Sequence, residues 1–250
     1  MTNGMYRERL SRVPGAVVWT GASGPGEKRI LPDGCMDLIW DGRSVQIAGP
    51  DTHAQIFASE QPSTMTGLRF APGYGPRVVG IPAHALIDQR VPLDAAWPAG
   101  DVEQLVDALH ATDHPGRMLE QAAIRAAGTV DANAVIVEQV VARARRGDTV
   151  ATIAAAVGWS TRHLQRHCRD AFGYGAKTLE RILRMTRAVE LAYAGTPFVT
   201  AALRTGYADQ AHLARDVKEL AGVPLGQLVE SAGNDANSST ELPSGSWMTA

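Results

Sequence analysis

The sequence has few cysteines and no long apolar run. Only two cysteines, Cys35 and Cys168, occur in 250 residues, which is too few for a disulfide framework and indicates reduced thiols. No apolar stretch reaches the roughly 18 residues of a membrane span, and residues 1–30 contain no apolar stretch of signal-peptide length. These absences argue against a secreted or membrane-spanning protein, so we expect a soluble, cytoplasmic one.

Signatures of catalysis and of metal binding are also missing. No glycine-rich phosphate loop, nucleophile elbow or pair of carboxylates with catalytic spacing stands out. Four of the histidines are scattered without the spacing that metal ligands show on one helix or loop. These are His53, His84, His110 and His114. We therefore expect a protein that is not an enzyme and that uses no metal or cofactor.

Basic residues are in surplus in only one part of the chain. The formal net charge is −2, whereas nucleic-acid-binding domains usually carry an excess of Lys and Arg that neutralises phosphates. Residues 130–230, however, contain 13 Lys and Arg against 10 Asp and Glu, while residues 1–129 contain 11 against 14. A nucleic-acid interface would therefore lie in the later block.

The first hundred residues have the sequence pattern of a β-rich domain. Gly and Pro recur every few residues, and the short pieces between them are rich in β-branched and aromatic side chains. Strands are expected at residues 17–19, 36–40, 45–47 and 66–70. Several short strands at this spacing favour a small barrel or sandwich.

Helical spacing of apolar side chains begins after residue 101. Residues 102–109 and 118–126 predict two connecting helices. Their apolar sides would either pack within the chain, which we favour, or form a dimer seam. From 131 to 229 the chain reads as helices separated by glycines.

The sequence therefore predicts an α+β protein with three folded parts and a tail. A small β-barrel-like domain occupies 1–100, connecting helices occupy 101–129, and an all-α domain occupies 130–230. The segment 231–250 is rich in Ser, Asn and Gly and poor in apolar residues, so we expect it to be disordered.

A repeat lies within the helical block. Positions between 154 and 173 recur between 202 and 222, with one extra residue after the turn of the second copy. The paired residues are Ala154 and Ala202, Gly158 and Gly206, Trp159 and Tyr207, Leu164 and Leu213, Arg166 and Arg215, Arg169 and Lys218, and Gly173 and Gly222.

Each copy has the layout of a helix-turn-helix unit. A short helix, expected over 150–157 and again over 199–205, is followed by a Gly that permits a left-handed turn and then by a longer helix. The small Ala before the turn lets the two helices cross closely, and the aromatic residue after the turn points into the core. Helix pairs broken by Gly occur in many all-α domains, but two copies in register, bridged by a basic helix over 177–193, indicate DNA binding.

The second helix of each unit presents donor-rich side chains. Ser160 is placed to cap the first of these helices. Arg can bond a guanine edge and Gln an adenine edge, and both can hold phosphates. Because Asp216 and Glu219 dilute the charge of the second unit, we expect it to read DNA more weakly. The candidate DNA-contacting residues are Ser160, Thr161, Arg162, Gln165, Arg166 and Arg169 in the first unit, and Asp209, Gln210, His212, Arg215 and Lys218 in the second.

Residues 135–229 resemble the C-terminal DNA-binding domain of AraC/XylS-type regulators. Segment 158–166 (GWSTRHLQR) resembles the first recognition helix of that family, 184–188 (RMTRA) its linker helix, and 206–215 (GYADQAHLAR) its second signature. The resemblance implies a monomer that places two recognition helices in successive major-groove segments, about 34 Å apart.

The sequence departs from the family pattern at a few core positions. Cys168 and Val217 stand where the family usually buries Phe, and Ala176 and Leu225 replace its usual Pro. These departures imply looser packing with the function retained, and they make Cys168 a core thiol.

The front half is similar to the sensor-type domain found ahead of some AraC-type DNA-binding domains. The segments that carry this similarity are 31–40 and 70–74. It implies a small β-barrel that binds an effector or dimerises. Four aromatic residues would line an apolar effector pocket, although core packing explains them equally well: Trp19, Trp40, Phe70 and Tyr74.

Three functions remain open from the sequence. The first is an effector-responsive, sequence-specific transcription regulator that binds double-stranded DNA in the major groove as a monomer or homodimer, with a small-molecule effector and RNA polymerase as candidate partners. The second is a thiol-based redox or alkylation sensor or acceptor in which Cys35 is delivered to DNA by the helical domain. Against it, AraC-type DNA-repair acceptors use a multi-cysteine metal site, and a small apolar residue at a strand start is the simpler account of Cys35. The third is an interaction protein with a degenerate helical domain.

Overall fold

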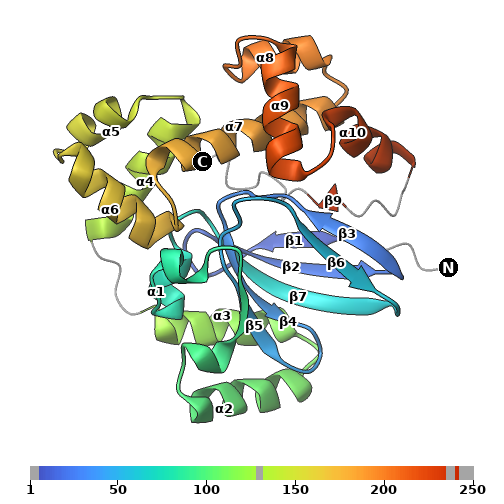
Figure 1. Cartoon of the computed structure of the whole chain (residues 1–250). Helices are drawn as coiled ribbons and strands as arrows, with labels where there is room; N and C mark the ends of the chain where they lie inside the picture. Colours follow the sequence, from blue (N-terminus) through green and yellow to red (C-terminus); the bar gives the residue numbers. More distant parts are fainter. Residues whose placement is uncertain (1–5, 128–131, 235–239, 242–250) are drawn as a thin grey trace.

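A six-stranded antiparallel sheet forms the centre of the N-terminal part of the chain (Figure 1). The computed structural model describes residues 6–127, 132–234 and 240–241. Strand order in this sheet is β1-β2-β7-β4-β5-β8, and the four strands expected from the sequence are its four central ones. The strands are β1 (Arg7–Leu10), β2 (Ala16–Ser23), β4 (Met36–Trp40), β5 (Val45–Ala48), β7 (Ser63–Phe70) and β8 (Arg90–Pro92).

One face of this sheet is covered by helices. Val18, Leu68, Leu38 and Ile47 are paired across four neighbouring strands, so their side chains share a face. The connecting helices pack against that face and bury their apolar stripes there, as the spacing predicted. The covering elements are α1 (Gly75–Val79), the short 3₁₀ turns η1 (Ala83–Leu86) and η2 (Leu93–Ala95), α2 (Ala99–His110) and α3 (Pro115–Ala126).

A second, smaller sheet completes the β-rich part. Strand β3 (Gly26–Ile30) pairs antiparallel with β6 (Gln55–Ser59) and parallel with β9 (Thr240–Glu241). The two sheets are not closed into one barrel. The prediction of a barrel-like domain is therefore confirmed as a β-rich, two-sheet domain and not as a closed barrel. The sequence analysis did not predict β3 and β6. Strand β3 lacks the usual β-branched and aromatic pattern, because three of its residues are charged.

The C-terminal segment departs from the expected disorder. Helix α10 (Leu225–Asn234) continues past residue 230, and Thr240–Glu241 form a strand. For these residues the prediction of a disordered tail over 231–250 is wrong, because backbone pairing with β3 needs no apolar side chains. Residues 235–239 and 242–250 lie outside the described residues.

Seven helices follow in the described residues 132–234, and the longest of them joins two groups (Figure 1). The first group comprises α4–α6 and the second α8–α10, with α7 running between them. The two short helices expected from the repeat and the bridging helix are present within a residue of their predicted bounds, and a longer helix follows each short one. The helices are α4 (Ala132–Arg145), α5 (Val150–Ala156), α6 (Thr161–Phe172), α7 (Ala176–Tyr193), α8 (Phe198–Arg204), α9 (Gln210–Ala221) and α10.

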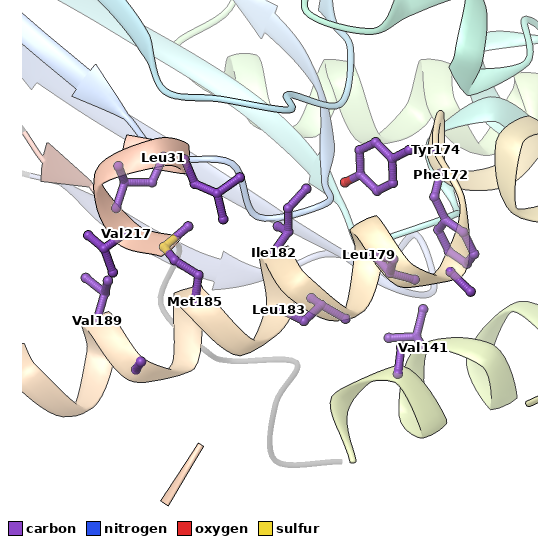
Figure 2. Packing of buried hydrophobic residues seen from close by; sticks show 14 of the residues in the cluster. Leu31, Val141, Phe172, Tyr174, Leu179, Ile182, Leu183, Met185, Val189 and Val217 are labelled. Atoms are coloured by element: carbon purple, nitrogen blue, oxygen red, sulfur yellow. The ribbon is translucent and has the colours of Figure 1, made fainter. Parts of the chain in front are cut away.

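A leucine of the N-terminal part completes the core of the helical part. Leu31, in the loop after β3, is 1% exposed and belongs to the hydrophobic cluster of the helices. Figure 2 shows it beside Met185 of α7 and Val217 of α9. Nearby, the Thr186 hydroxyl donates to the carbonyl oxygens of Ile182 and Pro32 at 3.0 and 3.3 Å. The β-rich and helical parts therefore share a packed boundary.

Candidate nucleic-acid interface

The two repeat units have the same turn geometry. Gly158 and Gly206 have φ angles of 71° and 82°, the left-handed region that a side chain with a Cβ rarely adopts. In each unit the backbone N–H of the following aromatic residue donates to the carbonyl of the buried Ala before the turn, at 2.9 Å for Trp159 and 3.0 Å for Tyr207. The helix-turn-helix layout predicted from the repeat is thus present twice.

Both recognition helices, α6 and α9, begin at a side-chain cap. The Ser160 hydroxyl accepts a 3.2 Å hydrogen bond from the backbone N–H of His163, as expected. In the second unit the Asp209 carboxylate accepts from the backbone N–H of His212 at 2.6 Å. An acidic side chain also suits the positive end of the helix dipole. The structure therefore gives Asp209, predicted as a DNA contact, a capping bond.

The exposed face of α6 is the one predicted from the sequence. Leu164 and Cys168 are fully buried on its inner side. None of the three arginines on the outer side forms a salt bridge with another described residue. The exposed predicted residues are Thr161, Arg162, Gln165, Arg166 and Arg169.

The exposed face of α9 carries fewer acidic side chains than expected. Gln210, Arg215 and Lys218 are exposed, whereas Asp216 is 6% exposed. His212 is half-buried, and its ring centre lies 5.0 Å from that of Tyr207 in a T-shaped arrangement. Asp216 therefore does not dilute the charge of this face, because its carboxylate points inward, whereas Glu219 is exposed. That the second unit reads DNA more weakly stays a prediction.

Asp216 belongs to a buried polar cluster that ties α9 to α7. It accepts a 2.7 Å hydrogen bond from the Tyr207 hydroxyl and forms a close ion pair with Arg181, which also binds Glu219 at 2.6 Å. Arg184 lies over the Tyr207 ring, 4.4 Å from its centre. Burial, together with the bond to Asp216, raises the pKa of Tyr207. Arg181 and Arg184 of α7 therefore hold the second unit in place.

The four aromatic residues proposed to line an effector pocket do not share one site. Trp40 and Phe70 are buried in the core between the large sheet and its helices. Trp19 lies on the opposite face, where its indole N–H donates to Asp37 at 2.6 Å. The Tyr74 hydroxyl donates to Glu138 of α4. Strand register separates Trp19 from Trp40 and Phe70, since neighbours along a strand point to opposite faces, whereas Tyr74 packs against the same core as those two.

A buried polar group occupies the sheet face that carries Trp19. Arg69 donates to Asp37 from Nε at 3.1 Å, and both side chains are largely buried. Gly67 leaves room for the indole, because a Cβ at this position would lie 2.2 Å from the Trp19 ring. This cluster fixes the indole and is more polar than an apolar effector pocket would be.

The environment of Cys35 gives no support to a thiolate sensor. Its side chain is 5% exposed, and burial, followed by the nearby Asp33 carboxylate, raises the pKa of the thiol well above its ordinary value. Burial also raises the pKa of Cys168 to about 12. Reactive cysteines instead need access and a depressed pKa, so the thiol-based alternative lacks a structural basis.

The described part of the chain shows neither a grouping of metal ligands nor a membrane-spanning helix. There, no three His, Cys, Asp or Glu side chains are grouped so that they could hold a metal ion. Among the helices of these same residues, none combines the length and apolar character needed to cross a membrane.

Family models match both parts of the chain. Residues 135–231 match the model of a helix-turn-helix domain, and residues 16–92 match that of a domain of unknown function, DUF6597. The comparison with curated proteins gives no match.

Solved structures of ToxT from Vibrio cholerae match this chain at low sequence identity. ToxT from strain O395 is 10% identical, with 86% of this chain and 97% of that chain covered and a TM-score of 0.47. Wild-type ToxT from strain SCE256 bound to an unsaturated fatty acid is 11% identical, with 88% and 96% covered and a TM-score of 0.46. ToxT from O395 bound to (E)-4-(8-methylnaphthalen-1-yl)but-3-enoic acid is 10% identical, with 85% and 98% covered and a TM-score of 0.47.

Proposed function

We propose that this protein is a sequence-specific DNA-binding transcription regulator of AraC type that responds to an effector through its N-terminal domain, because residues 135–231 match the model of a helix-turn-helix domain. In this proposal the β-rich domain spans 1–100, connecting helices span 101–129, and the DNA-binding domain spans 130–230. The protein acts in the cytoplasm on double-stranded DNA, as a monomer or homodimer, with RNA polymerase as a candidate partner.

The observation that supports DNA binding most directly is the pair of capped recognition helices with exposed basic faces. Arg162, Arg166 and Arg169 are exposed on α6, and Arg215 and Lys218 on α9. A helix-turn-helix unit places the N-terminal residues of its second helix against base edges in the major groove. Free, exposed guanidinium groups at these positions are suited both to guanine edges and to phosphates.

The residues divide by their position along each helix. Thr161, Arg162, Gln165 and Arg166 lie in the first turns of α6 and read bases, while Arg169 lies further along and holds phosphate. In the second unit Gln210 and Arg215 read bases and Lys218 holds phosphate. Ser160, Asp209 and the half-buried His212 shape the helix starts at the DNA surface.

Effector control is supported by where the β-rich domain touches the recognition helices. His84 Nδ1 lies 3.2 Å from Asp170 Oδ1 near the end of α6. The backbone N–H of Ala54 donates to the carbonyl of Leu220 at 2.7 Å near the end of α9. A ligand that favours one arrangement of the β-rich domain would thereby favour one relative placement of the two helices, which is the differential interaction that allosteric control requires.

Selection of bound sequences from a random DNA pool by the full-length protein, at two salt concentrations, tests the proposal. We expect an enriched motif with two parts separated by one helical turn, about 10–10.5 base pairs, and an affinity that falls as salt rises. Weak binding without enrichment at either salt concentration would contradict sequence-specific recognition.

A further inference from the structure

A basic cleft lies between the two helix-turn-helix units. Its walls are the segment 145–150, which leads into α5, and the segment 203–206, which forms the end of α8 and the following turn. The floor is one side of α7, from Ala176 to Arg187. The hollow has a volume of about 1140 Å³, so it can admit part of a large ligand.

The lining of the cleft is strongly cationic. Six basic side chains line it against two acidic ones, Asp148 and Glu180. Glu180 already binds Lys177 at 2.8 Å and Arg184 at 2.9 Å, and Asp148 lies between two arginines. The basic residues are Arg145, Arg146, Lys177, Arg184, Arg187 and Arg204.

Two exposed cations of the lining form no salt bridge within the described residues, although the carboxyl of Glu190 on α7 interacts electrostatically with Arg187. These two are Arg187, on α7, and Arg204, at the end of α8. Arg187 lies on the floor of the hollow and Arg204 on one of its walls. An anion bound in the hollow would be attracted by both charges.

The position of the cleft indicates which anion this is. In a helix-turn-helix protein the first helix of each unit crosses the DNA backbone. The cleft lies where the first helix of unit one, α5, begins and where the first helix of unit two, α8, ends. In the proposed complex with DNA, it would lie opposite the backbone between the two major-groove segments that the recognition helices enter.

We propose that this cleft binds the phosphates that flank the intervening minor groove, with Arg187 and Arg204 as the contacting residues. The inference rests on the proposed function, because it needs DNA to span both units. It adds a third contact region, formed by the linker helix and the inner ends of the units, to the two recognition helices. Since phosphate contacts carry no direct sequence information, this region would set affinity and spacing rather than base preference.

The test compares the double variant Arg187→Gln/Arg204→Gln with wild type on DNA selected by the wild-type protein. Each phosphate contact contributes about 0.9 to the slope of log affinity against log salt, so losing two lowers the slope by roughly 1.8. Between 50 and 200 mM salt, the wild-type affinity should therefore fall roughly tenfold more than that of the variant. The matched control is Arg117→Gln/Arg125→Gln, two exposed arginines of α3, which should keep the wild-type slope.

Hydroxyl-radical footprinting of the same complexes separates this inference from the proposed function. Wild type should protect the two half-sites and the backbone between them, and the double variant should lose only the protection between them. If the variant keeps the wild-type slope and the middle protection, the cleft does not contact DNA. If wild type protects no half-sites at all, the proposed function fails first and the inference falls with it. Thermal unfolding of both double variants verifies that they fold like wild type.

Discussion

Arg29 of β3 donates a 2.8 Å hydrogen bond from Nη1 to the carbonyl oxygen of Ala221, the last residue of α9. The C-terminal carbonyls of a helix lack partners within the helix, and a cation also suits the negative end of its dipole. The β-rich domain thus stabilises the far end of the second recognition helix, opposite to the end that faces DNA in our proposal.

Replacing Arg29 by Ala should loosen that end of α9. We expect a loss of about 1 kcal/mol in the free energy of unfolding, and faster amide hydrogen exchange in the last turn of α9 than in wild type. Arg43→Ala, at an exposed turn between β4 and β5, is the control. Equal exchange rates in the last turn of α9 in the two variants would show that the bond does not order the helix.

Leu31→Ala should destabilise the protein strongly, because the side chain is 1% exposed within the helical core. Truncating a buried Leu to Ala typically costs about 2–5 kcal/mol, measured here by urea unfolding followed by circular dichroism. The same change at Leu10, which is 72% exposed, should cost far less. Similar losses for the two variants would place Leu31 outside the shared core.

The exposed arginines of α6 should differ from an arginine elsewhere in their effect on DNA binding. Arg162→Ala or Arg166→Ala should weaken binding to the selected DNA by about 1–3 kcal/mol and relax specificity at one base position. Arg125→Ala, on α3, should leave affinity and specificity unchanged. The measurement is a titration against the selected sequence and its single-base variants, and wild-type behaviour of both α6 variants would mean that another surface reads the DNA.

Asp209 should act through its cap rather than through DNA. Asp209→Ala should lower the free energy of unfolding by about 1 kcal/mol, because the backbone N–H of His212 loses its acceptor. Asp209→Asn retains an acceptor, so it should keep most of the stability and bind DNA no more weakly than wild type. A loss of affinity in the Asn variant without loss of stability would instead identify the carboxylate as a DNA contact.

Glu120 should make stability depend on pH in the acidic range. Burial opposes its ionisation, but hydrogen bonds from the Arg9 guanidinium and from the backbone N–H of Arg12 lower the pKa of the carboxyl from 4.5 to about 2. A lowered pKa stabilises the folded state above the ordinary value, and that stabilisation is lost as pH falls from 4.5 toward 2.

The melting temperature recorded between pH 6 and pH 3 measures this dependence. The profile of Glu120→Gln should be flatter than that of wild type, whereas Glu103→Gln, at an exposed site on α2, should follow wild type. Parallel profiles for wild type and Glu120→Gln would show that another group sets the acid sensitivity.

The sequence by itself determined the helix-turn-helix units. The glycine at each turn, the Ser160 cap and the spacing of Leu164 and Leu213 act over a few residues, so the repeat predicted both the helices and the exposed face of α6 correctly. These local features can be predicted from the sequence because helix caps and left-handed turns depend on neighbouring residues rather than on distant ones.

Only the tertiary structure decided which side chains meet across the fold. Strand register placed Trp19 on one face of the sheet and Trp40 on the other, and the packing of α9 against α7 turned Asp216 inward. Leu31 likewise packs into the helical core far from it in sequence. Arg187 and Arg204 line the same cleft although they belong to different helices. Spacing along a chain fixes the face of a helix or strand, but the partner of that face is chosen by the free energy of burying both surfaces together.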